Sequence, residues 1–134
     1  MLKYNVYLKK LGVKKSDYPF KKEIGDMRYY EDPFTHIREV ETWGLDSTII
    51  MMLYSYLVYF RDVTICHPVK YTEKEWDDIL DEMIKGFEEY IKWTYGDEKY
   101  KDTCDEYFTE QDEVMKGVIK SMELLKDNLF DLDW

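Results

Sequence analysis

Carboxylate side chains are the residues of this chain with the most evident chemical potential. The sequence holds 29 Asp and Glu against 19 Lys and Arg, a formal net charge of −10. Asp78 and Asp81 are three positions apart, as are Asp102 and Asp105, and helical nucleotide hydrolases bind magnesium through two acid pairs of this spacing on neighbouring helices. Because so many acids produce such spacings by chance, a metal-dependent nucleotide hydrolase is a minor alternative. We expect no metal site, no cofactor and no catalysis.

Histidine and cysteine offer no stronger site. His36 and His67 are far apart in the sequence, and neither has an acid at a spacing that would make a convincing metal site. Cys66 precedes His67, but adjacent side chains of an extended segment point in opposite directions and do not readily share a proton. Cys66 and Cys104 do not form a Cys-x-x-Cys motif, so we expect reduced thiols rather than a disulfide framework.

The acid is concentrated in the C-terminal half of the chain. Residues 1–70 carry 11 Lys and Arg against 9 Asp and Glu, whereas residues 71–134 carry 8 against 20, a net charge of −12. A field of this kind repels nucleic acid and attracts basic protein surfaces. The sequence therefore predicts an acidic face that binds a partner protein with a basic surface, and its candidate residues are Asp77, Asp78, Asp81, Glu82, Glu88 and Glu89.

The N-terminus has the opposite charge, since residues 1–22 contain 7 Lys and 1 Asp. This basic arm either lies across the acidic helices of its own chain or reaches a neighbouring subunit or an anionic ligand. In the second case Arg38 is a candidate contact for phosphate. Trp43 and Tyr54 are candidates for the surroundings of a nucleotide base or of a partner's side chain.

Two acidic amphipathic helices must carry the acidic face. Thr72 and Glu75 form a capping box that starts the first helix, predicted over residues 73–95. Thr109 can cap the second helix, predicted over residues 109–129. Apolar residues recur at spacings of three and four in both helices: Trp76, Ile79, Leu80, Met83, Ile84, Phe87 and Ile91 in the first, and Val114, Met115, Val118, Ile119, Met122, Leu125 and Leu129 in the second.

A further helix is predicted over residues 46–61, with Asp46 or Ser47 as its cap. Its residues are apolar on nearly every face, which predicts a buried central helix covered by the two acidic helices and by part of the N-terminal region or of a second subunit. A β-strand is the alternative, because Ile, Val and Tyr favour sheets. Residues 1–41 fit strand and helix periodicities equally and are left as an irregular arm with turns. The expected fold is therefore a single all-α domain, a small helical bundle.

The apolar stretch of residues 49–60 is short of the roughly 20 residues that span a bilayer, so we expect no membrane segment.

Residues 34–95 resemble a known group of proteins. Trp43-Gly44-Leu45-Asp46 is a Trp-x-Leu-Asp motif that leads into the hydrophobic helix, and a proline-containing loop and the sequence Thr72-x-x-Glu75-Trp76-Asp77-x-Ile79-Leu80-Asp81-x-Met83-Ile84 follow it. This pattern is similar to that of small uncharacterised proteins encoded by tailed bacteriophages. The resemblance implies a helical fold and a phage context but no functional site. Within the motif, we expect Trp43 to pack beside the start of the helix, Leu45 to act as a hydrophobic staple and Asp46 to cap.

These patterns favour a non-enzymatic binding protein that acts in the cytoplasm of the infected bacterial host. The leading hypothesis is inhibition of a host defence or nucleic-acid-processing protein through the acidic face. The alternatives are an oligomeric sponge that sequesters a nucleotide signal, and an accessory subunit of the virion or of replication. A homo-oligomer is expected in each case, because the apolar helix and Trp134 need more cover than one chain supplies.

Overall fold

The structure, a computed structural model, describes residues 2–21, 30–96 and 104–133, apart from the side chains of residues 104–106. Its α-helices are α1 (Val6–Lys10), α2 (Leu45–Val63), α3 (Glu73–Tyr95) and α4 (Cys104–Asn128), and its 3-10 helices are η2 (Glu39–Thr42) and η3 (Leu129–Asp131). Within these ranges, extended pairing is limited to an isolated bridge between Glu31 and Arg38. The predicted all-α bundle is confirmed.

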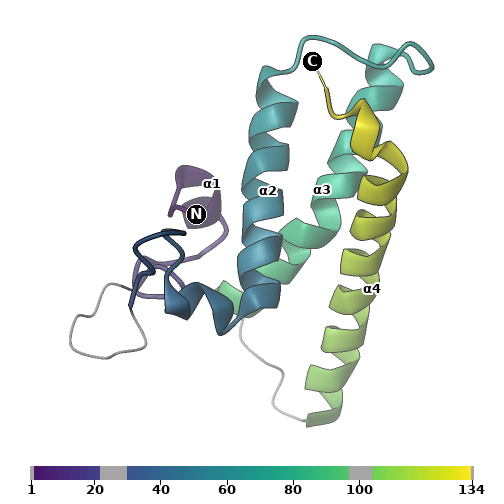
Figure 1. Ribbon diagram of the computed structural model, residues 1–134. Helices are drawn as coiled ribbons and strands as arrows, with labels where there is room; N and C mark the ends of the chain where they lie inside the picture. Colours follow the sequence, from purple (N-terminus) through teal and green to yellow (C-terminus); the bar gives the residue numbers. More distant parts are fainter. Residues whose placement is uncertain (1, 22–29, 97–103, 134) are drawn as a thin grey trace.

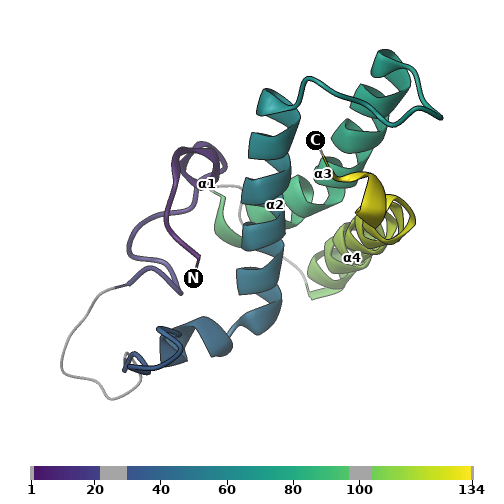
Figure 2. The same cartoon turned by 45° about the horizontal axis from the view of Figure 1, so that its top comes forward.

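Helix α3 occupies the middle of the bundle. It packs along α4 on one side and against α2 on the other, and both views show α2 and α4 flanking it (Figures 1 and 2). The sequence prediction gave this place to the helix of residues 46–61. Helix α2 instead has a buried face that includes Met51 and Leu57 and an open face on which Tyr56 is 70% exposed. A tyrosine ring is stable at a solvent-exposed surface because its hydroxyl is solvated. The tyrosines of α2 therefore allow one face of the helix to be exposed, although nearly all of its residues are apolar or aromatic.

The start of α2 differs from the predicted one. The helix begins at Leu45 after an N-cap at Gly44, which has no side chain to accept a capping hydrogen bond. Asp46 lies in the first turn, where its carboxylate accepts a hydrogen bond from the Tyr90 hydroxyl at 3.2 Å. The Ser47 hydroxyl lies 2.9 Å from the same Tyr90 oxygen. Leu45 is half-exposed and forms no staple, so this motif connects α2 to α3 instead of capping a helix.

The predicted N-terminal cap is present at α3 but not at α4. At α3 the Thr72 hydroxyl accepts from the Glu75 N–H at 3.2 Å, and the Glu75 carboxylate accepts from the Thr72 N–H at 2.8 Å. The predicted capping box is therefore confirmed. Helix α4 begins at Cys104, so Thr109 lies inside the helix and is not its cap. A threonine hydroxyl is compatible with both positions, since it can also bond within a helix.

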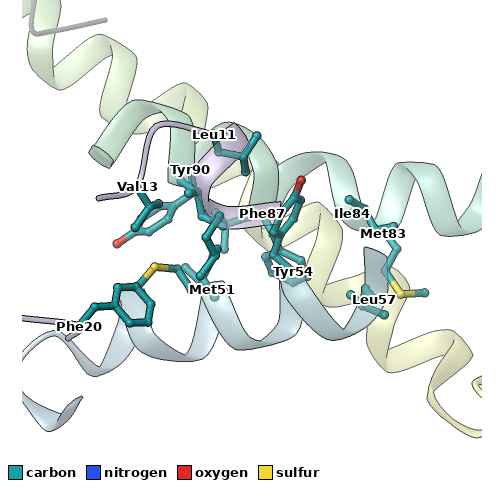
Figure 3. Packing of buried hydrophobic residues seen from close by; sticks show 14 residues of the cluster. Leu11, Val13, Phe20, Met51, Tyr54, Leu57, Met83, Ile84, Phe87 and Tyr90 are labelled. Carbon is teal, nitrogen blue, oxygen red and sulfur yellow. The ribbon is translucent and has the colours of Figure 1, made fainter. Parts of the chain in front are cut away.

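The basic N-terminal segment folds onto α2. The side-chain oxygen of Asn5 accepts hydrogen bonds from two backbone N–H groups and so caps α1. The side-chain nitrogen of Asn5 donates to the Ser55 hydroxyl of α2 at 3.0 Å. Four buried residues of this segment join the shared core: Leu8, Leu11, Val13 and Phe20. Figure 3 shows Phe20 beside Met51 of α2. The arm is thus part of the folded core.

The C-terminal residues return to the loop between α2 and α3. Lys70 forms an ion pair with Asp131 at 2.8 Å, and the Tyr71 hydroxyl donates to the side-chain carbonyl of Asn128 at 3.3 Å. Trp134, for which cover was expected, lies outside the described residues. In the described part of the chain, no helix has both the length and the apolar character needed to cross a bilayer.

The closest approach of two helices lies at Gly86 of α3 and Gly117 of α4. The Gly86 N–H donates to the buried Ser121 hydroxyl at 2.9 Å, which ties the two helices together. A Cβ atom at Gly86 would overlap the Gly117 carbonyl and the Ser121 hydroxyl, whereas a Cβ at Gly117 would meet the Glu89 carboxylate at an ordinary 3.5 Å. Of these two glycines, therefore, Gly86 is the one that requires the absence of a side chain.

We expect Gly86→Ala to lower the free energy of unfolding by about 3 kcal/mol, the upper part of the range for forcing extra atoms into a packed core. Gly117→Ala is the matched control, and we expect it to be neutral or to stabilise by up to about 1 kcal/mol, because alanine favours the helix more than glycine does. Chemical denaturation measures both values. Equal destabilisation by the two substitutions would contradict the packing described here.

Candidate functional site

Two of the six predicted partner-binding acids are engaged with α2. The Arg61 guanidinium contacts the Asp81 carboxylate at 3.1 Å and the Asp77 carboxylate at 3.5 Å. All three side chains are partly exposed, so the pairs add little to stability. They do fix the direction in which these two carboxylates point, which is toward α2 rather than toward a partner.

Three of the other four acids pair with lysine. Asp78 pairs with Lys74 at 2.7 Å and Glu88 with Lys92 at 2.7 Å, both along α3 itself, and Glu82 pairs with Lys120 of α4 at 3.4 Å. Glu89 is exposed and makes no ion pair within the described residues. Helical periodicity places the six acids in two adjacent rows, Asp77, Asp81 and Glu88 in one and Asp78, Glu82 and Glu89 in the other. A lysine or arginine pairs with five of these six carboxylates.

The three predicted ligand-binding residues lie in three different places. Tyr54 lies in the hydrophobic core at 6% exposure (Figure 3). Burial, followed by the negative charge of Glu88, raises the pKa of Tyr54 to about 12. Trp43 packs against the Tyr18 ring, with 6.0 Å between the ring centroids. Arg38 lines a cavity.

This cavity, which we call the cationic cavity, has a volume of about 660 Å³. Its lining residues come from the N-terminus, from the segment after α1 and from the turn before η2: Leu2, Lys3, Tyr4, Lys15, Phe20, Glu31 and Arg38. Three of these residues are cations and one is an acid. The charge of these described lining residues is therefore opposite in sign to the net charge of −10 that the chain carries.

Contacts within the N-terminal segment position one wall of the cationic cavity. The Tyr4 hydroxyl donates to the Val13 carbonyl at 2.9 Å, and the Tyr4 and Phe20 rings meet edge to face at 5.4 Å. The Lys15 ammonium lies over the Tyr4 ring at 5.9 Å from its centroid, within the range of a cation–π contact. This wall consequently presents two aromatic rings and a lysine side by side.

A tight turn positions the opposite wall. The Asp32 carboxylate accepts the N–H groups of Thr35 and Phe34, each at 2.8 Å, and these bonds hold the pKa of Asp32 below its ordinary value. The turn brings Glu31 and Arg38 together as a bridge. The Arg38 N–H donates to the Glu41 carboxylate at 2.8 Å, which anchors the backbone at the start of η2. The Arg38 guanidinium makes no ion pair within the described residues.

The sequence predicted only part of this arrangement. It pointed to Arg38 and to the basic arm as contacts for an anionic ligand, but it gave no signal for Tyr4, Phe20 or Glu31. No fixed spacing connects the three lining segments, because contacts distant in sequence bring them together. Asp102 of the predicted acid pairs lies outside the described residues, and so does the side chain of Asp105. Elsewhere in the described part, no three His, Cys, Asp or Glu side chains are grouped to hold a metal ion.

Comparisons with known protein families, with curated proteins and with solved structures find no match to this chain. Its function is therefore inferred from its own geometry.

The raised pKa of Tyr54 predicts a loss of stability in alkali. The folded protein holds the phenolic proton more tightly than the unfolded chain, whose tyrosine has a pKa near 10.0, so stability falls as the pH rises from about 10 towards 12. We expect Tyr54→Phe to remove this contribution and to flatten the decline in the free energy of unfolding between about pH 10 and pH 12. Tyr56→Phe, on the exposed face of α2, is the matched control. An equally steep decline in Tyr54→Phe and in the wild type would contradict the core position of this hydroxyl.

Proposed function

We propose that the protein is a non-enzymatic binding protein whose cationic cavity holds a small organic anion of the nucleotide class. The observation that carries the proposal is the convergence of Lys3, Lys15 and Arg38 on one cavity of a strongly acidic chain. Glu31 is the single acid among the described lining residues, so these residues together have an excess of two positive charges. Such a concentration of cations favours an anionic ligand.

The size and chemistry of the cavity support this ligand class. A volume of about 660 Å³ is within the roughly 300–1,000 Å³ of small-molecule sites. The Arg38 guanidinium offers paired donors that match a phosphate group, and the two lysines offer further charge. Tyr4 and Phe20 offer apolar ring surface for a base. A nucleotide has both an anionic group and a planar ring, and so it uses both walls.

The resemblance to phage proteins supports a setting for this activity. On that basis we propose that the protein acts in the cytoplasm of an infected bacterium, where binding would withdraw a nucleotide signal from its receptors. In such a role the protein binds the nucleotide without changing it chemically. The amount of nucleotide withdrawn would depend on the concentration of the protein and on its affinity for the nucleotide.

Calorimetric titration of the purified chain with inorganic phosphate, a nucleoside monophosphate and a cyclic dinucleotide tests the cavity. We expect a nucleotide to bind more tightly than phosphate, because only the nucleotide reaches the rings. Arg38→Gln and Lys15→Gln should each weaken binding by about 10-fold or more, the effect of losing one hydrogen bond to a charged group.

Lys14→Gln is the matched control for Lys15→Gln. Lys14 is the neighbouring residue, it is exposed and it lies outside the cavity, yet its substitution changes the net charge equally. We expect Lys14→Gln to bind like the wild type. Failure of every nucleotide to bind, or an equal loss in both lysine variants, would overturn the proposal.

A second candidate function is inhibition of a host protein with a basic surface. It is favoured by the carboxylates that no internal ion pair engages in the described part of the chain, including Glu89 on α3 and Glu113 on α4, both exposed. Asp77 and Asp81 are poor test positions because they also hold Arg61.

For this candidate, the double variant Glu89→Lys and Glu113→Lys should release any host protein that the wild type captures from bacterial lysate at low salt. Capture should also fail at high salt, because exposed charges are then screened. Capture that survives both changes would count against an acidic binding surface.

A further inference from the structure

Helix α4 has a second apolar face that the chain leaves open. One face of the helix packs on α3 through Gly117, Val118 and Ser121. Beside it runs a row of large apolar side chains with exposures between 43% and 59%: Phe108, Met115, Ile119, Met122 and, in η3, Leu129. At 3.6 residues per turn, the members in α4 fall within about 60° of arc. We call this row the open stripe.

The open stripe has the spacing of a helix-to-helix seam. Phe108, Met115, Met122 and Leu129 follow one another at intervals of seven residues, the repeat that lets two helices pack along their length. Contiguous apolar surface of this kind is unusual on a monomer and marks an interaction site. The regular interval indicates that the occupant is itself a helix.

Charges beside the open stripe identify the helix that fits. Asp112, Ile119 and Lys126 form a second row at intervals of seven, with an acid at one end and a base at the other. Within the described residues Asp112 makes no ion pair, and Lys126 pairs only with its exposed neighbour Asp127, at 3.7 Å. If two copies of α4 pack antiparallel about a two-fold axis at Ile119, each Asp112 meets the other copy's Lys126. A parallel pair would place like charges together at both positions.

We propose that the open stripe is a two-fold interface and that its occupant is α4 of a second copy of this chain, in antiparallel orientation. Such an interface is isologous, since the same residues are used on both copies. The pair buries the apolar row and forms two Asp112–Lys126 ion pairs at its rim. Helix α2 lies between α4 and the segments that form the cationic cavity, so the dimer leaves that cavity open (Figures 1 and 2). The dimer and the ligand site are therefore tested independently.

Sedimentation of the full-length chain over a concentration series provides the test. We expect a reversible species of twice the chain mass of 16.4 kDa. Ile119→Lys should abolish it. Asp112→Lys and Lys126→Asp should each weaken dimerisation at least 10-fold, because each places like charges at both ends of the seam.

The charge pattern also predicts rescue. The double variant Asp112→Lys and Lys126→Asp should dimerise like the wild type, since it restores both pairs in the antiparallel arrangement but not in a parallel one. An equimolar mixture of the two single variants should form the mixed dimer, which has opposite charges at both contacts.

Glu113→Lys is the matched control for Asp112→Lys. It makes the same charge change one residue further along, on a side of α4 that faces away from the open stripe, and we expect normal dimerisation. Circular dichroism of every variant should match the wild type, because all the substituted side chains are exposed. A monomer at all concentrations, a dimer indifferent to the single charge changes, or a double variant that stays monomeric would each overturn the proposal.

Discussion

Helices α3 and α4 approach each other so closely at Gly86 that the site has no room for a side chain. The Ser121 hydroxyl accepts the Gly86 N–H at the same point and fixes the rotation of α4 about its own axis. Because helical positions are separated by fixed angles, directing Gly117 and Ser121 at α3 turns Met115 and Ile119 outward. This one contact therefore determines what α4 contributes to the core and which apolar residues it leaves on the surface.

The second organising constraint is charge. The acidic half of the molecule largely balances its α3 carboxylates locally, through Arg61 and through lysines one turn away. In the described part of the chain, Lys3 and Lys15 form no ion pair with α3, and Asn5 and the apolar residues of the N-terminal segment attach it to the core. Lys3 and Lys15 are consequently available at the cationic cavity. Among the described lining residues of the cavity these cations outnumber the acid Glu31, which favours an anion there although the chain as a whole is acidic.

The features that could be predicted from the sequence are those that depend on residues close together in the chain. The capping box of Thr72 and the apolar periodicity of α3 and α4 depend on neighbours within a few residues, so the helices and the all-α class were predictable. The central place of α3 and the open face of α2 were not, because the tyrosines of α2 suit a core and a wet surface equally. For the candidate site, the sequence indicated Arg38 and a basic arm. It could not indicate Tyr4 or Phe20, since contacts such as Asn5 with Ser55 have no characteristic spacing.

The N-terminal segment is synthesised before the residues that it packs against. Its hydrogen-bond partners are distant in sequence. The Asn5 side chain donates to the Ser55 hydroxyl, and the Tyr18 carbonyl accepts from the Tyr95 hydroxyl, 77 positions later, at 3.4 Å. During synthesis this segment leaves the ribosome before α2 and α3, which follow it in the sequence, so it cannot pack against them until they too have left the exit tunnel. Closing such long loops is slow relative to helix formation. The segment is therefore made before its partners but fixed in place only after them, and the cationic cavity is completed only then.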